Sequence, residues 1–430
     1  MSNFLTIERS PLRNLGSRTK GDKVIWAAVV LLALVSLLTV YSSTGLLAYK
    51  LSKGNNEIYL FKQFAFIIVG LLVIYFAHRV NYTFYSRAAL ILFLVSIPLL
   101  VYTLFFGVSL NEGSRWIQLP IIKQTIQTSD LAKLSLFMYL SRLLSKKQDV
   151  IKDFKKGFLP LIIPVGIVCI LIAPANLSTA LLIGATSMML MFIGRVSGKH
   201  LLLTIAVALI PVMILILAAV IRHKSNGDVV EKPKTENHSR LLVRVDTWIN
   251  RVESFMYGTK ESNSDNDYQV NQAKIAIAKG GWIGLGPGNS QQRNFLPHPY
   301  SDFIYAIIIE EYGLIGGAII IGIYLLFLFR SIRIYKRCPF AFGAFLALGL
   351  SFTLMVQALA NMAVNVNLFP VTGVTLPLVS MGGSSFLFTC LAIGILLSVA
   401  RNVEQLEGDK VERELEAAEA RNETQAVISE

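Results

Sequence analysis

Residues 201–221 read LLLTIAVALIPVMILILAAVI and carry no charged side chain. An α-helix rises about 1.5 Å per residue, so a helix of this length reaches about 30 Å, the thickness of the hydrocarbon core of a bilayer. The whole chain has the same character, because 54% of its 430 residues are hydrophobic and only 16% are charged. A soluble domain needs more charge to cover its surface. The sequence therefore predicts an all-α polytopic membrane protein.

Further apolar segments on both sides of this stretch predict ten transmembrane helices in all. The fourth is the least apolar, because it carries Asp130, Lys133 and Arg142. The ten predicted spans are residues 24–41, 58–77, 88–106, 129–144, 158–173, 178–194, 200–221, 302–329, 341–365 and 384–400.

The predicted spans divide the chain into three parts and leave one long connection. A basic N-terminal tail covers residues 1–23, the ten-helix membrane domain covers 24–400, and an acidic tail covers 401–430. Residues 223–301 form one large loop between the seventh and eighth spans. Because the polar tail runs directly into a segment of spanning length, we expect the first helix to be an uncleaved insertion signal.

Basic side chains are distributed unevenly between the two sides of this arrangement. With a cytoplasmic N-terminus, the short inner loops hold 14 Lys and Arg residues and the short outer loops hold 4. Cytoplasmic loops of membrane proteins carry such an excess. The sequence thus predicts cytoplasmic termini and an extracytoplasmic large loop. The formal charge of +13 then reflects topology and contact with anionic headgroups, so nucleic-acid binding is not expected.

The large loop contains two helical patterns and a glycine-rich turn. Apolar residues recur at helical spacing in LLVRVDTWINRVESFM (241–256), which is typical of a helix lying on the membrane or on the protein itself. A second helix is expected in DYQVNQAKIAIAKGG (267–281), ending at its two glycines. The turn GGWIGLGPGNS (280–290) follows no predicted strand and lacks the Gly-Lys-Ser/Thr of a phosphate loop, so nucleotide binding is not expected.

Three carboxylates mark the start of the eighth span, in HPYSDFIYAIIIEEYGL (298–314). Asp302 lies at the outer end, where it either caps the helix or has a chemical role facing water. Glu310 and Glu311 lie about 12 Å deeper along the helix. A carboxylate there needs a cation, a polar partner or a cavity. We expect both glutamates to be structural and paired with groups of other helices.

Basic and polar residues of neighbouring segments are candidates to share a cavity with Asp302. Lys133 follows Asp130 by three residues, so the two lie on one helix face. Arg115 is either a ligand for an anionic substrate or an interfacial anchor beside Trp116. Together these groups predict a charged, water-filled cavity that opens outward. The ninth span adds polar residues that line this cavity or tie helices together, namely Gln357, Asn361, Asn365 and Asn367.

Five blocks of the sequence follow one another in the order of a known family. They are GSRWIQL (113–119), QTSDLAKL (127–134), YQVNQAKIAIAKGGWIGLGPGNS (268–290), HPYSDFIYAIIIEEYGLIGG (298–317) and FPVTGVTLPLVSMGGSS (369–385). The chain resembles the SEDS family (shape, elongation, division and sporulation proteins) in these blocks. The likeness runs from about residue 24 to 400, and the loop pattern is closer to the division members than to the elongation members.

The chain departs from the family pattern at several positions. Thr128 and Asp130 replace the usual Pro and Glu of a Gln-Pro-Ser-Glu motif, and Met381 replaces a usual Tyr. Asn176 stands where the family often has an aspartate, so no catalytic role is assigned to it. None of these departures affects Asp302.

The resemblance implies a peptidoglycan glycosyltransferase that polymerises lipid II on the outer face of the bacterial cytoplasmic membrane during division. It places the family's essential carboxylate at Asp302, for which we predict the role of general base. The predicted substrate-binding residues are Arg115, Lys133, Asp130, Ser129, Arg244, Gln269, His298, Asn361 and Ser384.

The resemblance also implies a class B penicillin-binding transpeptidase and other division proteins as partners. No metal site is expected, because the three cysteines are scattered, although a divalent cation is left open as a cofactor. Two other functions remain. The first is a flippase for the same lipid-linked precursor, since buried acids suit transport, although no inverted repeat is evident. The second is a non-enzymatic division scaffold.

Overall fold

Long helices make up most of the structure, with a small sheet at one end. The computed structural model describes residues 21–51, 55–110, 113–118, 125–225, 240–257 and 265–429. The α-helices are α2 (Lys23–Ser43), α3 (Gly45–Leu51), α4 (Glu57–Arg79), α5 (Tyr82–Phe106), α6 (Thr128–Lys146), α7 (Leu159–Ile172), α8 (Leu177–Ile193), α9 (Gly198–Ser225), α10 (Arg240–Tyr257), α11 (Asp265–Gly280), α12 (Ile304–Arg337), α13 (Ala341–Asn365) and α14 (Gly383–Ser429). Shorter helical turns are η1 (Gln148–Val150), η2 (Phe154–Phe158) and η3 (Gln292–Asn294).

Each of the ten predicted spans falls on a helix, which confirms a helical, multi-pass membrane protein. Within the described residues, eight helices are long and apolar enough to cross a bilayer by length and composition. Helix α8 is apolar but shorter, and α6 is not among the eight. The number of ten spans and the cytoplasmic position of the termini stay predictions.

Polar side chains begin three of these helices. Asp22 caps α2, Asn81 caps α5 and Asn176 caps α8, each by accepting a hydrogen bond from an amide two or three residues further on. The first turn of a helix has no internal partner for these amides, so the caps fix where the helices start. Asn176 therefore has a structural role, which an aspartate at this position would also fill.

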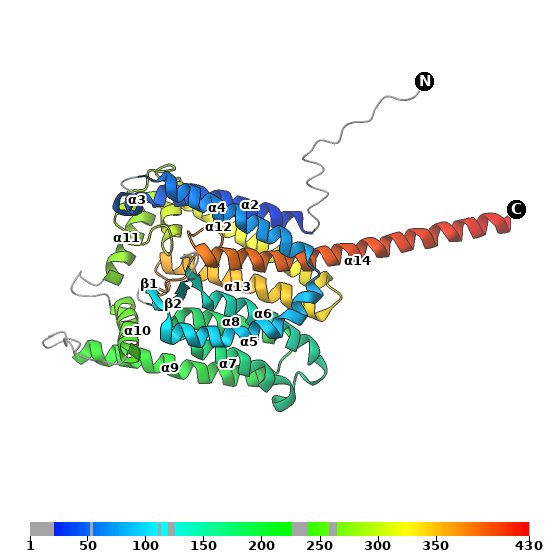
Figure 1. Cartoon of the computed structure of the whole chain (residues 1–430), viewed down its shortest axis with the longest axis horizontal. Coiled ribbons are helices and arrows are strands. Elements are labelled where there is room, and N and C mark those ends of the chain that lie inside the picture. Colours follow the sequence, from blue (N-terminus) through cyan, green and yellow to red (C-terminus); the bar gives the residue numbers. More distant parts are fainter. Residues whose placement is uncertain are drawn as a thin grey trace, which may run out of the picture.

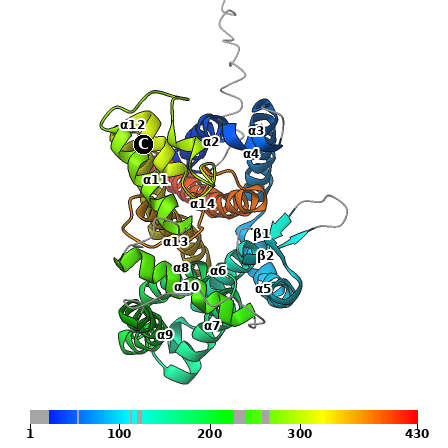
Figure 2. The same cartoon turned by 90° about the vertical axis from the view of Figure 1, so that its left-hand side faces the viewer.

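Helices α13 and α14 form the centre of the bundle. Of the apolar spans they are the most buried, whereas α9 is the most exposed. Helix α14 packs along α4, and α13 packs along α12 and α6. Figure 1 shows α3, α10, α11 and the strands at one end of the bundle, with α14 projecting from the other. Figure 2 views the first of these ends, where α9 lies at the periphery.

The segment before α6 forms a sheet that the sequence analysis did not predict. Strands β1 (Val108–Leu110), β2 (Gly113–Gln118) and β3 (Thr125–Gln127) pair antiparallel in the order β1-β2-β3. In the register of β2 and β3, Trp116 lies opposite Gln127. The sheet thereby brings both residues to the start of α6.

The two helices predicted in the large loop are confirmed as α10 and α11. Helix α11 ends at Gly280, and Gly281 follows with a φ of +51°. Such left-handed backbone commonly ends a helix at a glycine. At the other end of the chain, α14 continues without interruption past residue 401 to Ser429.

Helix α12 is broken at Gly313, where φ is +70° and ψ is −176°. Residues other than glycine rarely adopt this conformation. A Cβ atom at Gly313 would lie 2.2 Å from the carbonyl oxygen of Trp282. The glycine-rich turn runs beside the break, and the N–H of Leu314 donates to the carbonyl of Gly281 at 2.9 Å. The turn therefore supplies hydrogen bonds that the break removes.

Candidate active site

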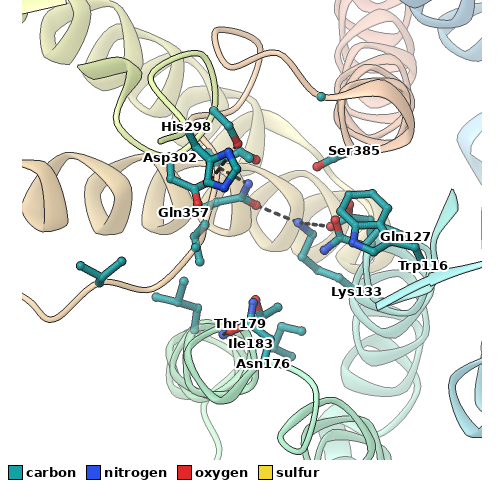
Figure 3. Close-up of a pocket in the computed structure, with 18 of the residues that line it drawn as sticks. Trp116, Gln127, Lys133, Asn176, Thr179, Ile183, His298, Asp302, Gln357 and Ser385 are labelled. Atoms are coloured by element: carbon teal, nitrogen blue, oxygen red, sulfur yellow. Dashed lines mark hydrogen bonds and ion pairs between the residues drawn. The ribbon is translucent and has the colours of Figure 1, made fainter. Parts of the chain in front are cut away.

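A cavity of about 530 Å³ opens at the end of the bundle that carries the sheet. Figure 3 shows side chains from β2, α6, α8, α13 and the loops before α12 and α14 converging on it. Five of the predicted site residues line this cavity, namely Asp130, Lys133, Gln269, His298 and Asp302. The structure therefore brings both acids and the predicted cation of α6 into one polar space.

The main chain at Asp302 is held from α13. Asn361 and Asn365 each donate from Nδ2 to the carbonyl oxygen of Asp302 at 2.9 Å. The Oδ1 atom of Asn365 accepts from the N–H of Ala306, in the first turn of α12, at 3.0 Å. Both asparagines are buried, and such polar groups are normally hydrogen-bonded. Asn361, predicted to bind substrate, therefore contacts the backbone that carries Asp302.

The loop before α14 holds the two carbonyl groups that precede Asp302. The carbonyl of Tyr300 accepts from the N–H of Met381 at 2.9 Å. The carbonyl of Ser301 accepts from the hydroxyl of Ser380 at 2.7 Å. With the bonds from α13, three consecutive carbonyls have partners. Backbone contacts thus fix the position of Asp302 and leave its side chain for another use.

The carboxylate of Asp302 lines the cavity and is partly exposed. Its Oδ1 atom accepts from the hydroxyl of Ser301 at 2.9 Å. The N-cap of α12 is Phe303, with no side-chain capping bond, so Asp302 is not the N-cap residue. Burial, and then the charge of Asp302, raise the pKa of Tyr300. The adjacent phenol therefore stays neutral at ordinary pH.

Lys133 is the cation of the cavity wall formed by α6. Its Nζ atom donates to Oε1 of Gln357 at 2.8 Å and lies 3.3 Å from Oδ1 of Asp130. Gln357 in turn donates to the carbonyl of Thr375 at 3.1 Å. In Figure 3, Lys133 and Gln357 lie between Asp302 and the Trp116–Gln127 pair. A charge in such a sheltered place acts on a ligand more strongly than it would in water.

The carboxylate of Asp130 has one oxygen in use and one without a partner. Oδ2 is buried and makes no hydrogen bond within the described structure. Leaving a buried polar atom unpaired costs about 1–3 kcal/mol. Asp130 lines the cavity, but this oxygen is itself closed off from it, so the contribution of Asp130 to the cavity is its pairing with Lys133.

Two further predicted site residues, Ser129 and Ser384, lie beside the main cavity, and the side chain of a third, Arg115, is not described. Ser129 lines a separate small cavity and accepts from Nε2 of Gln127 at 3.0 Å. Ser384 accepts from the backbone N–H of Gln127 at 3.0 Å, while its neighbour Ser385 lines the main cavity. Arg115 belongs to β2, but its side chain lies outside the described residues.

Arg251 of α10 lines the main cavity, and the sequence analysis did not select it. Its Nη1 atom donates to the carbonyl of Val371 at 3.3 Å. The predicted Arg244 lies two helical turns earlier and donates to the carbonyl of Ala175 at 3.5 Å. Both arginines line a second cavity of about 180 Å³ between α8, α9 and α10. The seven-residue spacing places both arginines on one helix face, so Arg251 could have been predicted from the sequence once Arg244 was selected.

Glu310 and Glu311 are both paired with polar groups. The predicted partner on another helix is confirmed for Glu311, whereas Glu310 bonds to the loop between α11 and α12. The carboxylate of Glu310 accepts from the hydroxyl of Ser290 and from the N–H of Gln291, the latter at 3.0 Å. The carboxylate of Glu311 accepts from the hydroxyl of Ser42. Both glutamates are fully buried, so these bonds replace hydration. They join α12 to α2 and to the loop that follows the glycine-rich turn.

Acidic and other metal-binding side chains are sparse in this part of the fold. In the described ranges, no group of three or more His, Cys, Asp or Glu side chains is placed to hold a metal ion. Two acids, Asp130 and Asp302, line the cavity. The use of a divalent cation stays a prediction.

Comparison with known proteins identifies the family of the chain. The family model described as "Cell cycle protein", which covers FtsW, RodA and SpoVE, matches residues 22–405. The chain belongs to the FtsW/RodA/SpoVE family. It is 30% identical over 405 residues to a probable peptidoglycan glycosyltransferase FtsW of Trichlorobacter lovleyi, covering 93% of this chain and 97% of that protein. It is 31% identical over 392 residues to stage V sporulation protein E of Bacillus subtilis, covering 89% and 98%.

Solved structures of FtsW/RodA/SpoVE-like chains share the fold. A chain from a structure of a peptidoglycan synthase complex superposes with a TM-score of 0.67 at 23% identity, covering 90% of this chain and 99% of that one. The rod shape determining protein RodA of Thermus thermophilus superposes with a TM-score of 0.60 at 20% identity, covering 89% and 97%. These superpositions confirm the membrane fold, while the family model and the relatives confirm the family resemblance. The roles of the individual site residues stay predictions.

Proposed function

We propose that the protein is a peptidoglycan glycosyltransferase that polymerises lipid II into glycan strands during cell division. The observation that carries this proposal is the partly exposed Asp302 carboxylate, which lies on a fixed backbone in a cavity also lined by Lys133. Membership in a family that includes proteins named as probable peptidoglycan glycosyltransferases supports it.

Asp302 acts as the general base in this reaction. Its carboxylate takes the proton from an acceptor hydroxyl while that oxygen forms a bond to the anomeric carbon of the donor sugar. The bond between this carbon and the diphosphate oxygen breaks, and its electron pair leaves with the diphosphate. Lys133 and Arg251, which both line the cavity, stabilise the charge that develops on the leaving group.

The cavity accommodates the polar head of the substrate while the polyprenyl tail stays in lipid. Gln269 and His298 line the cavity beside Asp302 and are suited to hydrogen-bond sugar hydroxyls. Asp130 lines the same cavity and holds Lys133 in place. Ser129 and Ser384 both accept from Gln127 of the cavity wall, and Asn361 holds the backbone at Asp302. Arg244 extends the positive charge toward α9.

The reaction takes place on the outer face of the cytoplasmic membrane at the division site, with both termini inside. We propose a class B penicillin-binding transpeptidase as the partner that crosslinks the product, together with other division proteins. The similarity in fold to a chain of a peptidoglycan synthase complex supports an assembly of this kind.

The test incubates the purified chain with lipid II, with and without the transpeptidase, and resolves the glycan strands on a gel. We expect strands from the wild type and none from Asp302→Asn. Normal strand formation by Asp302→Asn would exclude Asp302 as the general base. Transfer of lipid II across vesicle membranes without polymer would favour a flippase, and normal division with Asp302→Ala would favour a scaffold.

A further inference from the structure

Polar contacts at both ends join α2 to α12. At one end, Nη2 of Arg330 lies 2.6 Å from Oδ2 of Asp22. At the other, the hydroxyl of Ser42 donates to the carboxylate of Glu311. The helix between Asp22 and Ser42 is about 30 Å long at 1.5 Å per residue, which matches the hydrocarbon core. The contact between Ser42 and Glu311 therefore marks the hydrocarbon boundary at the cavity end of the bundle.

The first part of the glycine-rich turn, residues 281–286, is attached to α12 at this boundary. The N–H of Gly286 donates to the carbonyl of Glu311 at 2.9 Å. The N–H of Ile315 donates to the carbonyl of Trp282 at 3.3 Å. A Cβ on Gly284 would lie 2.3 Å from the carbonyl oxygen of Glu311, so the turn and the helix backbone are in direct contact. The depth of the turn is thus set by the depth of the break in α12.

The turn directs two large apolar side chains away from the protein. Trp282 is 74% exposed and Ile283 is 81% exposed. The adjoining residues of α12 that point outward are also apolar, and Leu314, Ile315 and Ile319 are between 43% and 57% exposed. These three lie on the membrane side of the break, where exposed apolar residues face lipid. The turn therefore continues the lipid-facing surface of α12.

We propose that Trp282 and Ile283 insert into the lipid leaflet at the cavity end of the bundle and form an interfacial anchor. Tryptophan suits this level because its ring is apolar and its N–H can bond to headgroups. Irregular backbone tolerates partial immersion only when its polar groups have protein partners. The bonds of the turn to α12 supply such partners.

The interfacial anchor is coupled to the segment that carries Asp302. Glu310 accepts from the backbone N–H groups of Gln291 and Gln292, at 3.0 and 3.2 Å, just after the turn. The half-helix from Ile304 to the break extends from this buried contact toward Asp302. The interfacial anchor is thereby linked, through Glu310 and this half-helix, to the backbone that carries Asp302.

The test measures the depth of Trp282 by fluorescence of the full chain in lipid nanodiscs. The acyl chains carry bromine atoms either near the headgroup or near the chain end, and the Trp282 signal is the difference between wild type and Trp282→Phe. We expect blue-shifted emission that shallow bromine atoms quench more than deep ones and that aqueous acrylamide hardly quenches. Quenching by acrylamide alone would overturn the proposal. Blue-shifted emission that no brominated lipid quenches would also overturn it, since a protein would then cover the turn.

A second measurement avoids any change at Trp282. Ile283→Cys and Asn294→Cys, made in a background without the three native cysteines, are labelled with a polarity-sensitive dye. Asn294 is exposed on the same loop and serves as the matched control. We expect an apolar environment for the dye at residue 283 and an aqueous one at residue 294. Aqueous spectra at both positions would overturn the proposal.

Discussion

The side-chain amide of Asn365 bridges the start of α12, because its Nδ2 donates to the carbonyl of Asp302 and its Oδ1 accepts from the N–H of Ala306. One buried side chain thus holds the residue before the helix and the first turn of the helix together. The relation is one of position, since the carboxylate of Asp302 takes no part in it. A substitution at Asn365 can therefore change the position of the carboxylate without removing it.

Asn365→Ala should reduce polymerisation without removing the carboxylate. The substitution removes the side-chain acceptor of the N–H of Ala306, which keeps only the carbonyl of Phe303, and leaves the carbonyl of Asp302 with Asn361 alone. A misplacement of about 1 Å lowers rates by up to about 10²-fold. We expect kcat to fall by about tenfold with little change in KM, in a steady-state assay with lipid II. Asn402→Ala, in the middle of α14 and away from the cavity, is the control, and an equal loss there would show a general effect on the fold.

Asp302→Asn should separate activity from stability. The amide oxygen of asparagine can still accept from Ser301, so the melting temperature in detergent should stay unchanged. Loss of a general base lowers rates by about 10²–10⁴-fold. Asp149→Asn, an exposed site far from the cavity, should keep full activity. A large drop in melting temperature for Asp302→Asn would instead indicate a structural carboxylate.

Lys133→Met should destabilise the protein as well as inactivate it. The substitution leaves the Asp130 carboxylate buried without its cation, and breaking a buried ion pair on one side costs about 3–5 kcal/mol. The double variant Lys133→Met with Asp130→Leu should recover most of this stability but not the activity. Thermal unfolding and glycan assays on the same preparations measure both quantities. Recovery of activity in the double variant would show that Lys133 takes no part in the reaction.

Gly313→Ala should disrupt the break in α12. The positive φ strains any other residue by about 1–3 kcal/mol, and the new Cβ would also meet the carbonyl of Trp282. Gly322→Ala is a matched control on the same helix, because a Cβ there meets nothing within 4 Å. Its expected effect is neutral or stabilising by up to about 1 kcal/mol. Similar melting temperatures for the two variants would contradict the contact between turn and helix.

The sequence predicted those parts of the fold that depend on length and composition. Apolar runs such as 201–221 specify membrane helices, since a segment that crosses the hydrocarbon core must be about 20 residues long, apolar and internally hydrogen-bonded. The break at Gly313 was not predicted, because the nearby Gly316, Gly317 and Gly322 remain helical, and the sequence does not distinguish Gly313 from them. Only the approach of a distant turn distinguishes Gly313, and that contact is tertiary.

The candidate site was predicted where a charge is costly and missed where helix phase or tertiary contact decides. Asp302, Asp130 and Lys133 were selected because a charge in or beside a membrane span costs free energy and usually has a function. All three line the cavity. Ser384 was selected although its neighbour Ser385 faces the cavity, which is a difference of one residue in helix phase. Asn361 was expected at the substrate, and its bond to a backbone carbonyl depends on how α13 packs against α12.

The three bonded carbonyls at residues 300–302 have a consequence for evolution. Every amino acid presents the same carbonyl oxygen, so the accepting side of this attachment survives changes of side chain. The donors Asn361, Asn365 and Ser380 have no such freedom. Mutations that accumulate around the cavity can therefore alter which molecules it accepts while Asp302 keeps its place.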